Sequence, residues 1–440
     1  MMRRGFKFNE LRCVGCKACV AACSIENEWS VQARSVFIYN PEAHPALPVI
    51  NLSLACNHCE EPLCMNGCPS GAIFRDYSTG AVLIDEKKCI GCKYCIWNCP
   101  YDAPEFDTVK GIVTKCNLCY TGLTEGRIPA CASACPTGAL GYGEIPDVFD
   151  NNNLLWFPGG KMNPAIRIDT ERNRKSPVII PENRFKSVIK ERKQDEKNID
   201  GEWSLIGFSY LVTLSVAVLI SSFLIGKNAD KITFFSLSVS PWILSLFHLG
   251  KKFRAWRSVS NVISSPLSRE ITIYIAYLII SVAAVLSGYS GLILGAFLTG
   301  LLLLITIDSV YYFSDGRSEL RLHSGQTFLT ALLVASFLSG MKYPFIFIAL
   351  IKLISAFYVI VNKKAVIFNF WFRYLRIALL IITGVSLITG IHSTEPVIIA
   401  FFLTGELIDR ILFYYDFDPP DINKLITRQT NSDFNEKKRG

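Results

Sequence analysis

The sixteen cysteines of this 440-residue chain constrain its fold more than any other feature. They all lie between Cys13 and Cys135, in four groups of four. The groups are Cys13-x2-Cys16-x2-Cys19-x3-Cys23, Cys56-x2-Cys59-x4-Cys64-x3-Cys68, Cys89-x2-Cys92-x2-Cys95-x3-Cys99 and Cys116-x2-Cys119-x11-Cys131-x3-Cys135. The opening residues, MMRRGFKFNELRC, contain no apolar run typical of a secretion signal. We therefore expect these cysteines to bind metal rather than to form disulfides.

The cysteine spacing indicates iron–sulfur clusters. C-x2-C-x2-C-x3-C-P is typical of bacterial ferredoxins, in which three closely spaced thiolates bind one cubane and the fourth binds another. Pro follows the last cysteine of three groups, and Ser24 follows that of the first. Four groups of four provide ligands for four [4Fe–4S] clusters with no cysteine left over. A zinc site is the alternative, but it usually takes two C-x2-C pairs and has no use for the third cysteine of such a run.

The chain after residue 203 has a different composition. It contains no cysteine and carries the excess of Leu, Ile, Val and Phe behind the mean hydropathy of +0.32. Eight apolar segments follow, and most reach the ~20 residues that a helix needs to cross a membrane. They are 203–226, 232–250, 270–287, 290–312, 325–340, 344–361, 371–391 and 396–415. These segments lack the polar faces that helices of a soluble protein would need, so they predict an eight-helix membrane bundle.

The positive charges indicate how this bundle is oriented. The loops on one side of the predicted helices, with the flanking segments 184–202 and 416–440, carry 20 Lys and Arg residues, and the loops on the other side carry 3. The positive-inside rule places the basic side, both termini and the cysteine region in the cytoplasm of a bacterial or archaeal cell. The net charge of +8 is therefore interpreted as a sign of membrane orientation, and no nucleic-acid partner is expected.

These patterns predict four regions. We expect an α+β ferredoxin-like domain of two double-cluster units over 1–160 and a charged linker or arm over 161–202. An all-α transmembrane anchor of eight helices follows over 203–417, and a polar tail over 418–440. Within the first region, alternating residues predict short strands at 5–9, 111–115 and 139–145, and a hairpin over 73–85.

The cysteine region resembles the four-cluster ferredoxin subunit of the complex iron–sulfur molybdoenzymes, in particular the dimethyl sulfoxide reductase family. The resemblance covers residues 5 to about 150 and rests on GFKFNELRCVGCKACVAAC, ACNHCEEPLCMNGCPSGAI, CIGCKYCIWNCPYDAP, and KCNLC with PACASACPTGAL. It implies that the first group pairs with the fourth, and the second with the third. The implied ligand sets are Cys13, Cys16, Cys19 and Cys135; Cys116, Cys119, Cys131 and Cys23; Cys56, Cys59, Cys64 and Cys99; and Cys89, Cys92, Cys95 and Cys68. Some members replace the cysteine equivalent to Cys92 with Trp and bind a three-iron cluster, so four cubanes are implied here.

The membrane region resembles the eight-helix anchor subunit of the same family. This resemblance rests on SLFHLGKKFRAWRSVSNVISSPLSREI at 245–271 and on GELIDRILFYY in the last segment. It implies a natural fusion of two subunits that passes electrons from menaquinol to a separate molybdopterin-containing catalytic subunit in anaerobic respiration. The Cys13 end of the cluster series would face that subunit, and the Cys89 end would face the membrane. The terminal substrate and the direction of electron flow stay open.

A candidate quinol site lies on the basic side of the predicted bundle. His248 ends the second apolar segment, Glu270 opens the third, and Arg254 and Arg257 lie between them. Oxidation of a quinol releases two protons with two electrons, so titratable side chains are needed beside the headgroup. We predict His248 and Glu270 as this site, with Arg254 and Arg257 as further candidates. The alternative is that these residues only anchor helix ends at the membrane interface.

Buried charges define the remaining alternatives. Lys352 falls inside an apolar segment, where a charge costs roughly 2.5–3.5 kcal/mol, and Asp308 or Glu406 are candidate partners. Glu406 and Arg410 are one helical turn apart and could pair instead. Such residues, with Asp409, would serve an ion-translocating redox protein, although we favour a structural network. An iron–sulfur partner of a quinone-linked hydrogenase is a third possibility. The histidines of this region, His248, His323 and His392, predict no haem site.

Overall fold

The computed structural model describes residues 2–39, 49–147, 157, 162–169, 203–226, 230–315, 323–362, 367–390 and 396–417. The predicted tail at 418–440 and most of the predicted linker at 161–202 lie outside these residues. The described residues form two compact units. The first contains the residues up to 169 together with residues 253–265, and the second contains the others.

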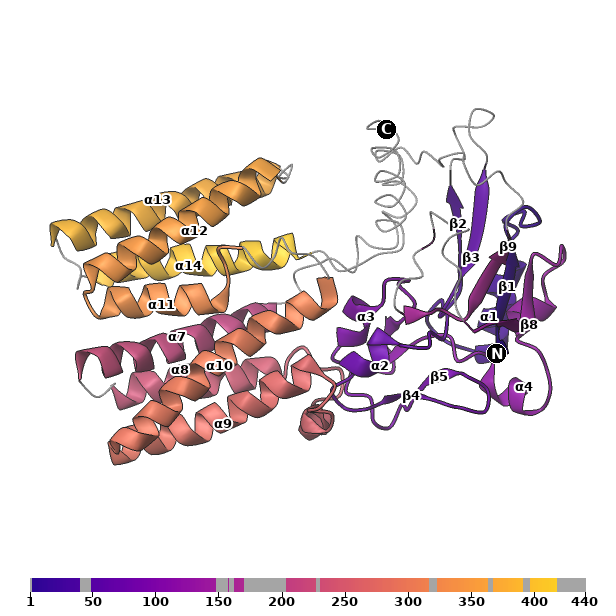
Figure 1. The fold of residues 1–440 in the computed structure, drawn as a ribbon, viewed down its shortest axis with the longest axis horizontal. Helices are drawn as coiled ribbons and strands as arrows, with labels where there is room; N and C mark the ends of the chain where they lie inside the picture. The colour runs from indigo at the N-terminus through magenta and orange to yellow at the C-terminus, as the bar shows by residue number, and fades with distance from the viewer. Residues whose placement is uncertain are drawn as a thin grey trace. The chain divides into compact units, whose positions relative to one another are not determined.

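Short strands form the framework of the first unit (Figure 1). β1 (Met2–Asn9) pairs antiparallel with β8 (Leu140–Pro146) and parallel with β9 (Ile166–Asp169), so it lies in the middle of the sheet. Three antiparallel hairpins accompany this sheet: β2 (Ser35–Tyr39) with β3 (Ile50–Leu54), β4 (Ile73–Arg75) with β5 (Val82–Ile84), and β6 (Glu105–Asp107) with β7 (Ile112–Thr114). The predicted strands and the predicted hairpin over 73–85 are confirmed, with small shifts of their ends.

The helices of the first unit are short and begin within or beside the cysteine groups. They are α1 (Ala18–Asn27), α2 (Leu63–Gly67), α3 (Tyr94–Asn98), α4 (Tyr120–Thr124) and α5 (Ala130–Ser133). α1 packs against α5, and α2 packs against α3. The helix of the first cysteine group therefore lies beside that of the fourth, and the helix of the second group beside that of the third.

The described part of the second unit contains eight helices. They are α7 (Trp203–Ile225), α8 (Lys231–Ser245), α9 (Pro266–Ser287), α10 (Ser290–Asp315), α11 (Thr327–Leu338), α12 (Lys342–Asn362), α13 (Ile367–Thr389) and α14 (Pro396–Asp416). α7 contacts α8, α10, α11 and α14, and Figure 1 shows it between α8–α10 on one side and α11–α14 on the other. The most apolar stretch of α7 is 67% buried, so this helix is the centre of the bundle.

Five of these helices are long and apolar enough to cross a membrane, so the prediction of eight similar spans is confirmed only in part. They are α7, α9, α10, α12 and α13. α8 has 15 residues and α11 has 12, and at about 1.5 Å per residue both are shorter than a hydrocarbon core of ~30 Å. α14 has 21 residues but carries Glu406, Asp409, Arg410 and Asp416, which lower its hydropathy.

The outer surface of the bundle is apolar. In α12 only 22% of the most apolar stretch is buried, and large side chains such as Ile354 and Phe357 are exposed at 69% and 67%. Comparable side chains on α9 and α13, such as Ile279 and Ile382, are also exposed. A helix that is apolar on its outer face suits lipid rather than water. The second unit is therefore a membrane-spanning region.

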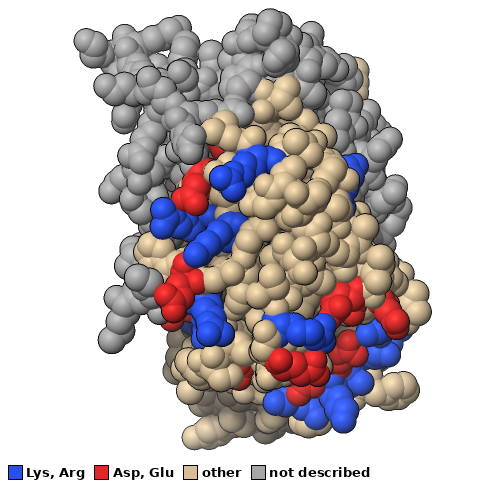
Figure 2. All heavy atoms as spheres, turned by 90° about the vertical axis from the view of Figure 1, so that its right-hand side faces the viewer, with Lys and Arg blue, Asp and Glu red and all other residues tan. Residues whose placement is uncertain are grey.

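Charged side chains are mixed by sign on the face drawn in Figure 2, where Lys and Arg lie among Asp and Glu. Ion pairs in the first unit are of this kind: Arg127 pairs with Glu125 and Glu26, and Arg167 pairs with Asp169. Such exposed pairs are screened by water and contribute little to the stability of the fold.

Candidate metal centres

Four cysteines from the two ends of the cysteine region line one cavity. Cys13, Cys16 and Cys19 come from the first group and Cys135 from the last, with Phe8 and Leu140 among the apolar residues around them. The cavity has a volume of about 20 Å³ and is partly open to solvent. A four-cysteine zinc site usually takes two C-x2-C pairs, whereas this lining takes three cysteines from one run and one from a distant group. This arrangement is the one that ferredoxin-type cysteine runs use to bind an iron–sulfur cluster.

A second cavity of the same size has an equivalent lining. Cys89, Cys92 and Cys95 of the third group face Cys68 of the second, with Ile73, Ile84 and Val113 around them. Three cysteines of one group and one from its neighbour thus surround each of these two spaces. The two cavities differ in exposure, because Cys16 is exposed whereas Cys68, Cys89 and Cys95 are buried.

The other eight cysteines gather in the same manner. The thiol of Cys23 interacts electrostatically with those of Cys131 and Cys119, and that of Cys116 interacts with those of Cys56, Cys23 and Cys131. Cys59 interacts with Cys56, Cys99 and Cys64. Each of these sets again combines cysteines from at least two groups.

The backbone of the cysteine loops is shaped by left-handed residues. Gly15 and Gly91 have φ angles of 70° and 71° at equivalent places in their groups, and Lys17 and Lys93 follow with 62° and 60°. Such angles favour glycine and turn the backbone sharply enough for successive cysteines to face one space. Backbone N–H groups then donate to the sulfurs: Ala72 to Cys68 over 3.3 Å, Leu140 to Cys135 over 3.3 Å, and Leu118 to Cys116 over 3.4 Å.

Burial favours the protonated form of these thiols. It raises the pKa of Cys23 to about 11 and that of Cys64 to about 12, and neighbouring cysteines add to the effect. Metal binding requires thiolates, so iron must displace these protons when it binds.

The rim of the first cavity is open and includes the exposed side chains of Val14 and Lys17. Cys16 is exposed, and the nearby Leu11 and Val14 are exposed at 45% and 66%. Exposed apolar side chains around a redox site are typical of a surface that another protein covers.

The segment between α8 and α9 forms hydrogen bonds with the backbone of residues that line or adjoin the second cavity. Arg254 donates hydrogen bonds to the carbonyl oxygens of Cys89 at 3.0 Å and Glu86 at 2.7 Å. Asn261 donates to the carbonyl of Cys68 at 2.9 Å, and Ser265 to that of Gly67 at 2.7 Å. Residues 253–265 therefore contact the backbone of two cysteines that line this cavity.

The candidate quinol-site residues do not lie where the sequence predicted them in their helices. α8 ends at Ser245, so His248 lies in the turn that follows it. α9 begins at Pro266, so Glu270 lies in its second turn, where it is 6% exposed. Arg254 and Arg257 lie in the 3-10 helix η4 (Lys252–Val259), and Arg257 stacks on the ring of Trp256. Glu270 interacts electrostatically with Arg410 and Asp308, which like Glu270 belong to the second unit. Arg254, by contrast, belongs to the first unit.

A network of buried ion pairs fills the second unit around α14. The pairs are Lys352–Glu406, Lys352–Asp409, Arg376–Asp409, Arg373–Asp416, His323–Asp416 and Arg410–Asp308. Of the two candidate partners of Lys352, the structure pairs it with Glu406, whereas Asp308 pairs with Arg410. Arg410 pairs with Asp308, so the structure corrects the alternative in which it paired with Glu406. Four cations other than histidine face four carboxylates, so the network is balanced in charge.

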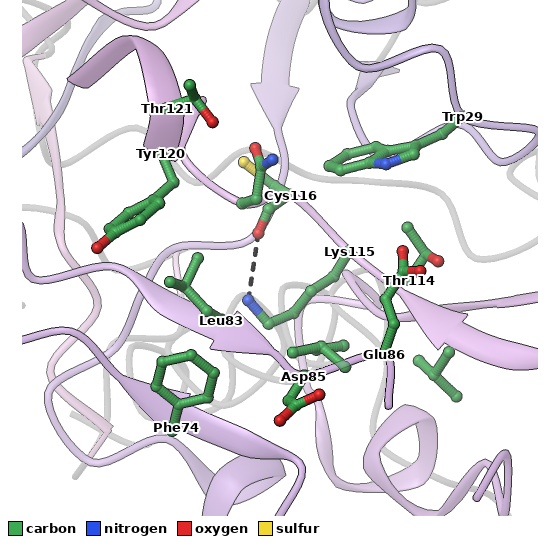
Figure 3. Close-up of a pocket in the computed structure, with 13 residues that line it drawn as sticks. Trp29, Phe74, Leu83, Asp85, Glu86, Thr114, Lys115, Cys116, Tyr120 and Thr121 are labelled. Atoms are coloured by element: carbon green, nitrogen blue, oxygen red, sulfur yellow. Dashed lines mark hydrogen bonds between the residues drawn. The ribbon is translucent and has the colours of Figure 1, made fainter. Parts of the chain in front are cut away.

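Sequence reasoning missed two buried cations of the first unit. Arg34 is 2% exposed, and Lys115 is 4% exposed. Figure 3 shows Lys115 beside an open pocket of about 350 Å³, with its ammonium group directed to the carbonyl oxygen of Cys116 at 3.2 Å. The position of Lys115 next to a predicted ligand was the one available signal. Arg34 had no such signal because it lies far from any cysteine in the sequence.

Comparisons with known proteins match this region of the sequence. Residues 48–145 match the family model of a 4Fe-4S dicluster domain. The B subunit of anaerobic dimethyl sulfoxide reductase from Haemophilus influenzae is 38% identical over 159 residues, covering 34% of this protein and 77% of the relative. The Escherichia coli protein of that name is 40% identical over 154 residues, covering 33% and 75%. A thiosulfate reductase electron transfer subunit from Salmonella typhi is 40% identical over 144 residues, covering 32% and 74%.

Proposed function

Because the chain belongs to the dimethyl sulfoxide reductase family, as an iron–sulfur subunit fused to a membrane anchor, we propose that it carries electrons from menaquinol through four [4Fe–4S] clusters to a separate molybdopterin-containing catalytic subunit. The catalytic subunit, and not this chain, would determine which molecule is the terminal electron acceptor. The relatives named after dimethyl sulfoxide and thiosulfate indicate that the acceptor differs within the family.

The ligand sets follow from the resemblance and are supported by the cavities. Cys13, Cys16, Cys19 and Cys135 would hold one cluster, and Cys68, Cys89, Cys92 and Cys95 another. The sets Cys23, Cys116, Cys119, Cys131 and Cys56, Cys59, Cys64, Cys99 would hold the remaining two. When bound, the clusters supply one-electron redox chemistry. The cysteines bind them, and the buried apolar residues around each cavity exclude water.

The observation that carries this proposal is the contact of residues 253–265 with Cys68 and Cys89. This segment joins two membrane helices, so the polypeptide that leaves α8 reaches the backbone of cluster ligands before it enters α9. We infer that electrons from the membrane enter at this set. The exposed rim of Leu11 and Val14 beside Cys16 would receive the catalytic subunit at the other end.

His248 and Glu270 are our candidates for the quinol site. His248 precedes the 253–265 segment by five residues, and Glu270 follows it by five. Glu270 is buried at the basic end of α9, where a carboxylate can take a proton from the headgroup. Arg254 donates two hydrogen bonds to backbone carbonyls, so we assign it to holding the Cys89 loop.

The proposal predicts that His248→Ala and Glu270→Gln slow quinol-driven reduction of the clusters at least tenfold, because proton removal from the quinol loses its acceptor. Reduction by dithionite should be unchanged, because it does not need the quinol site. The measurement is the rate of cluster bleaching in membranes after a reduced menaquinol analogue is added.

Lys231→Ala is the matched control, because this exposed lysine also lies at a helix end. Unchanged quinol-driven reduction in both His248→Ala and Glu270→Gln would contradict the assignment. These residues would then be interfacial anchors only.

A further inference from the structure

Two cations are buried in the cysteine unit without a carboxylate. Neither Arg34 nor Lys115 forms an ion pair with Asp or Glu within the described ranges. Arg34, just before β2, donates one hydrogen bond to Ser53 Oγ at 3.0 Å and lies 4.7 Å from the ring centre of Phe6. Its Nε and Nη2 atoms have no hydrogen-bond partner among the described residues. Lys115 donates to the carbonyl oxygens of Val82 and Cys116.

A buried charge is costly unless an opposite charge lies nearby. In the second unit the buried cations Lys352, Arg373, Arg376 and Arg410 all have carboxylate partners. In the first unit the neighbouring anions are cysteine sulfurs instead. Arg34 interacts electrostatically with Cys131, Cys116, Cys19 and Cys23, and Lys115 with Cys56, Cys64 and Cys116.

Arg34 is linked to the predicted cluster ligand Cys19 through the hydroxyl group of Ser53. Ser53 Oγ lies 3.3 Å from Cys19 Sγ and accepts the hydrogen bond from Arg34. Lys115 directly follows β7 in the sequence. Figure 3 shows its ammonium group directed to the carbonyl oxygen of Cys116. Cys116 is the cysteine that both cations share.

We propose that Arg34 and Lys115 set the reduction potentials of the clusters that they adjoin, and that the anionic clusters are their missing counter-charges. This inference rests on the proposed function, since it requires the clusters to be bound. An added electron makes a cluster more negative, and a fixed positive charge in a low-dielectric interior stabilises that extra charge. Each cation therefore raises the potential of its neighbours.

The electrostatic neighbours of the two cations, together with the Arg34–Ser53–Cys19 and Lys115–Cys116 contacts, indicate which reduction potentials should move. Arg34 adjoins the sets that contain Cys19 and Cys116, and Lys115 adjoins those that contain Cys116 and Cys56. Arg34→Gln should lower two of four midpoint potentials, and Lys115→Met should lower two. One potential is lowered in both variants, and the potential of the set containing Cys68 and Cys89 is lowered in neither. A titration can recognise this pattern, in which one cluster responds to both variants and one responds to neither, even before each EPR signal is assigned to a cluster.

The test is an EPR-monitored redox titration of the purified complex. We expect the ratio of reduced to oxidised cluster at a fixed potential to fall about tenfold for an affected cluster, which corresponds to about 59 mV for a one-electron couple. Arg34→Lys keeps the charge and should restore most of the parent potential. Arg167→Gln removes one exposed, paired positive charge and should move no potential.

The outcomes separate this inference from the proposed function. A parent protein without four clusters, by iron content and EPR, would contradict the proposed function itself. Four clusters with unchanged potentials in Arg34→Gln and Lys115→Met would overturn the inference alone, as would equal shifts of all four. Should Arg34→Gln fail to load its clusters, Lys115→Met decides the inference by whether two potentials move and two do not.

Discussion

Lys352 illustrates how a single buried residue is stabilised in this protein. Its side chain is fully buried within α12, where it pairs with Glu406 and Asp409 of α14 and donates to Thr330 Oγ1 at 2.7 Å. An unpaired ammonium in that place would be strongly unfavourable. The pairing therefore couples α12 to α14 and α11 through one side chain.

Lys352→Met should destabilise the protein by about 3–5 kcal/mol, because it leaves the Glu406 carboxylate buried without a cation. The double variant Lys352→Met/Glu406→Gln should regain part of that loss, since both charges are then removed. The measurement is the thermal unfolding midpoint in detergent. Lys342→Met, at the exposed start of the same helix, is the control and should change little. Equal midpoints for Lys352→Met and Lys342→Met would contradict this account.

The length of this ion-pair network can be compared with the membrane thickness that the alternative function, ion translocation, would require. Its residues on α14 run from Glu406 to Asp416, which is about 15 Å of helix axis, against ~30 Å for a hydrocarbon core. Among the described residues the network thus covers about half the thickness of a membrane. Its balanced charges support our interpretation of it as a structural network.

Single residues were predicted unevenly from the sequence. A lysine inside an apolar segment demands a partner, so the Lys352–Glu406 pair could be anticipated. The partner of Arg410 could not, because local spacing offered Glu406 while the helix packing brings Asp308 to it. Arg34 and Lys115 escaped prediction because a cation in a polar sequence is normally exposed, and only the fold buries them.

At the scale of elements, the place of β1 in its sheet depends on the close approach of Gly5 to the strands on both sides. A Cβ on Gly5 would collide with the carbonyl oxygen of Ala165, just before β9, and with the side chain of Ile145 on β8. The alternation of Phe6, Lys7 and Phe8 places two buried rings on one face of the strand. Gly5 thus lets the central strand fit between its two neighbours.

Gly5→Ala should destabilise the first unit by about 1–3 kcal/mol, because a backbone atom cannot move aside as a flexible side chain can. The expected result is a lower temperature for loss of visible cluster absorbance. Gly141→Ala in the neighbouring β8 is a matched control, since its Cβ would meet nothing closer than 3.9 Å. If the two variants lost their clusters at the same temperature, the close approach at Gly5 would not matter.

Elements were predicted where their periodicity is strict. The strands of the first unit alternate cleanly, and their prediction was right. The start of α9 was placed four residues late, although Pro266 is a frequent first residue of helices and could have located it. α8 was predicted too long because Leu246, Phe247 and Leu249 continue the apolar run beyond its end, and α11 is two residues shorter at each end than its predicted range.

At the scale of the whole molecule, the polypeptide combines a cluster-binding unit with a membrane unit. The iron–sulfur character of the first unit could be predicted because thiolate chemistry restricts cysteine spacing so strongly, and the assignment of each cysteine to a cluster stays a prediction. The membership of residues 253–265 in the first unit could not, because these residues lie between two apolar segments and carry no cysteine. Only the contacts of Arg254, Asn261 and Ser265 reveal it.

The proposed role predicts that a large molybdenum- or tungsten-containing protein co-purifies with this one from detergent-solubilised membranes. Leu11→Glu/Val14→Glu should release that protein, because two carboxylates would be desolvated at the rim of the first cavity. Metal analysis and mass spectrometry of the complex provide the measurement, with Ile25→Glu, also exposed, as the control. A nickel–iron protein as the partner would instead favour the hydrogenase alternative.

The membership of residues 253–265 in the cysteine unit also sets an order of synthesis. During translation all sixteen cysteines leave the ribosome before α7 and α8, yet the segment that holds Cys68 and Cys89 emerges only after both helices. Domains that fold during synthesis do so as their residues become available. The contacts around Cys68 and Cys89 can therefore form only after α7 and α8 have been synthesised, so the first unit is completed by residues that follow two helices of the second.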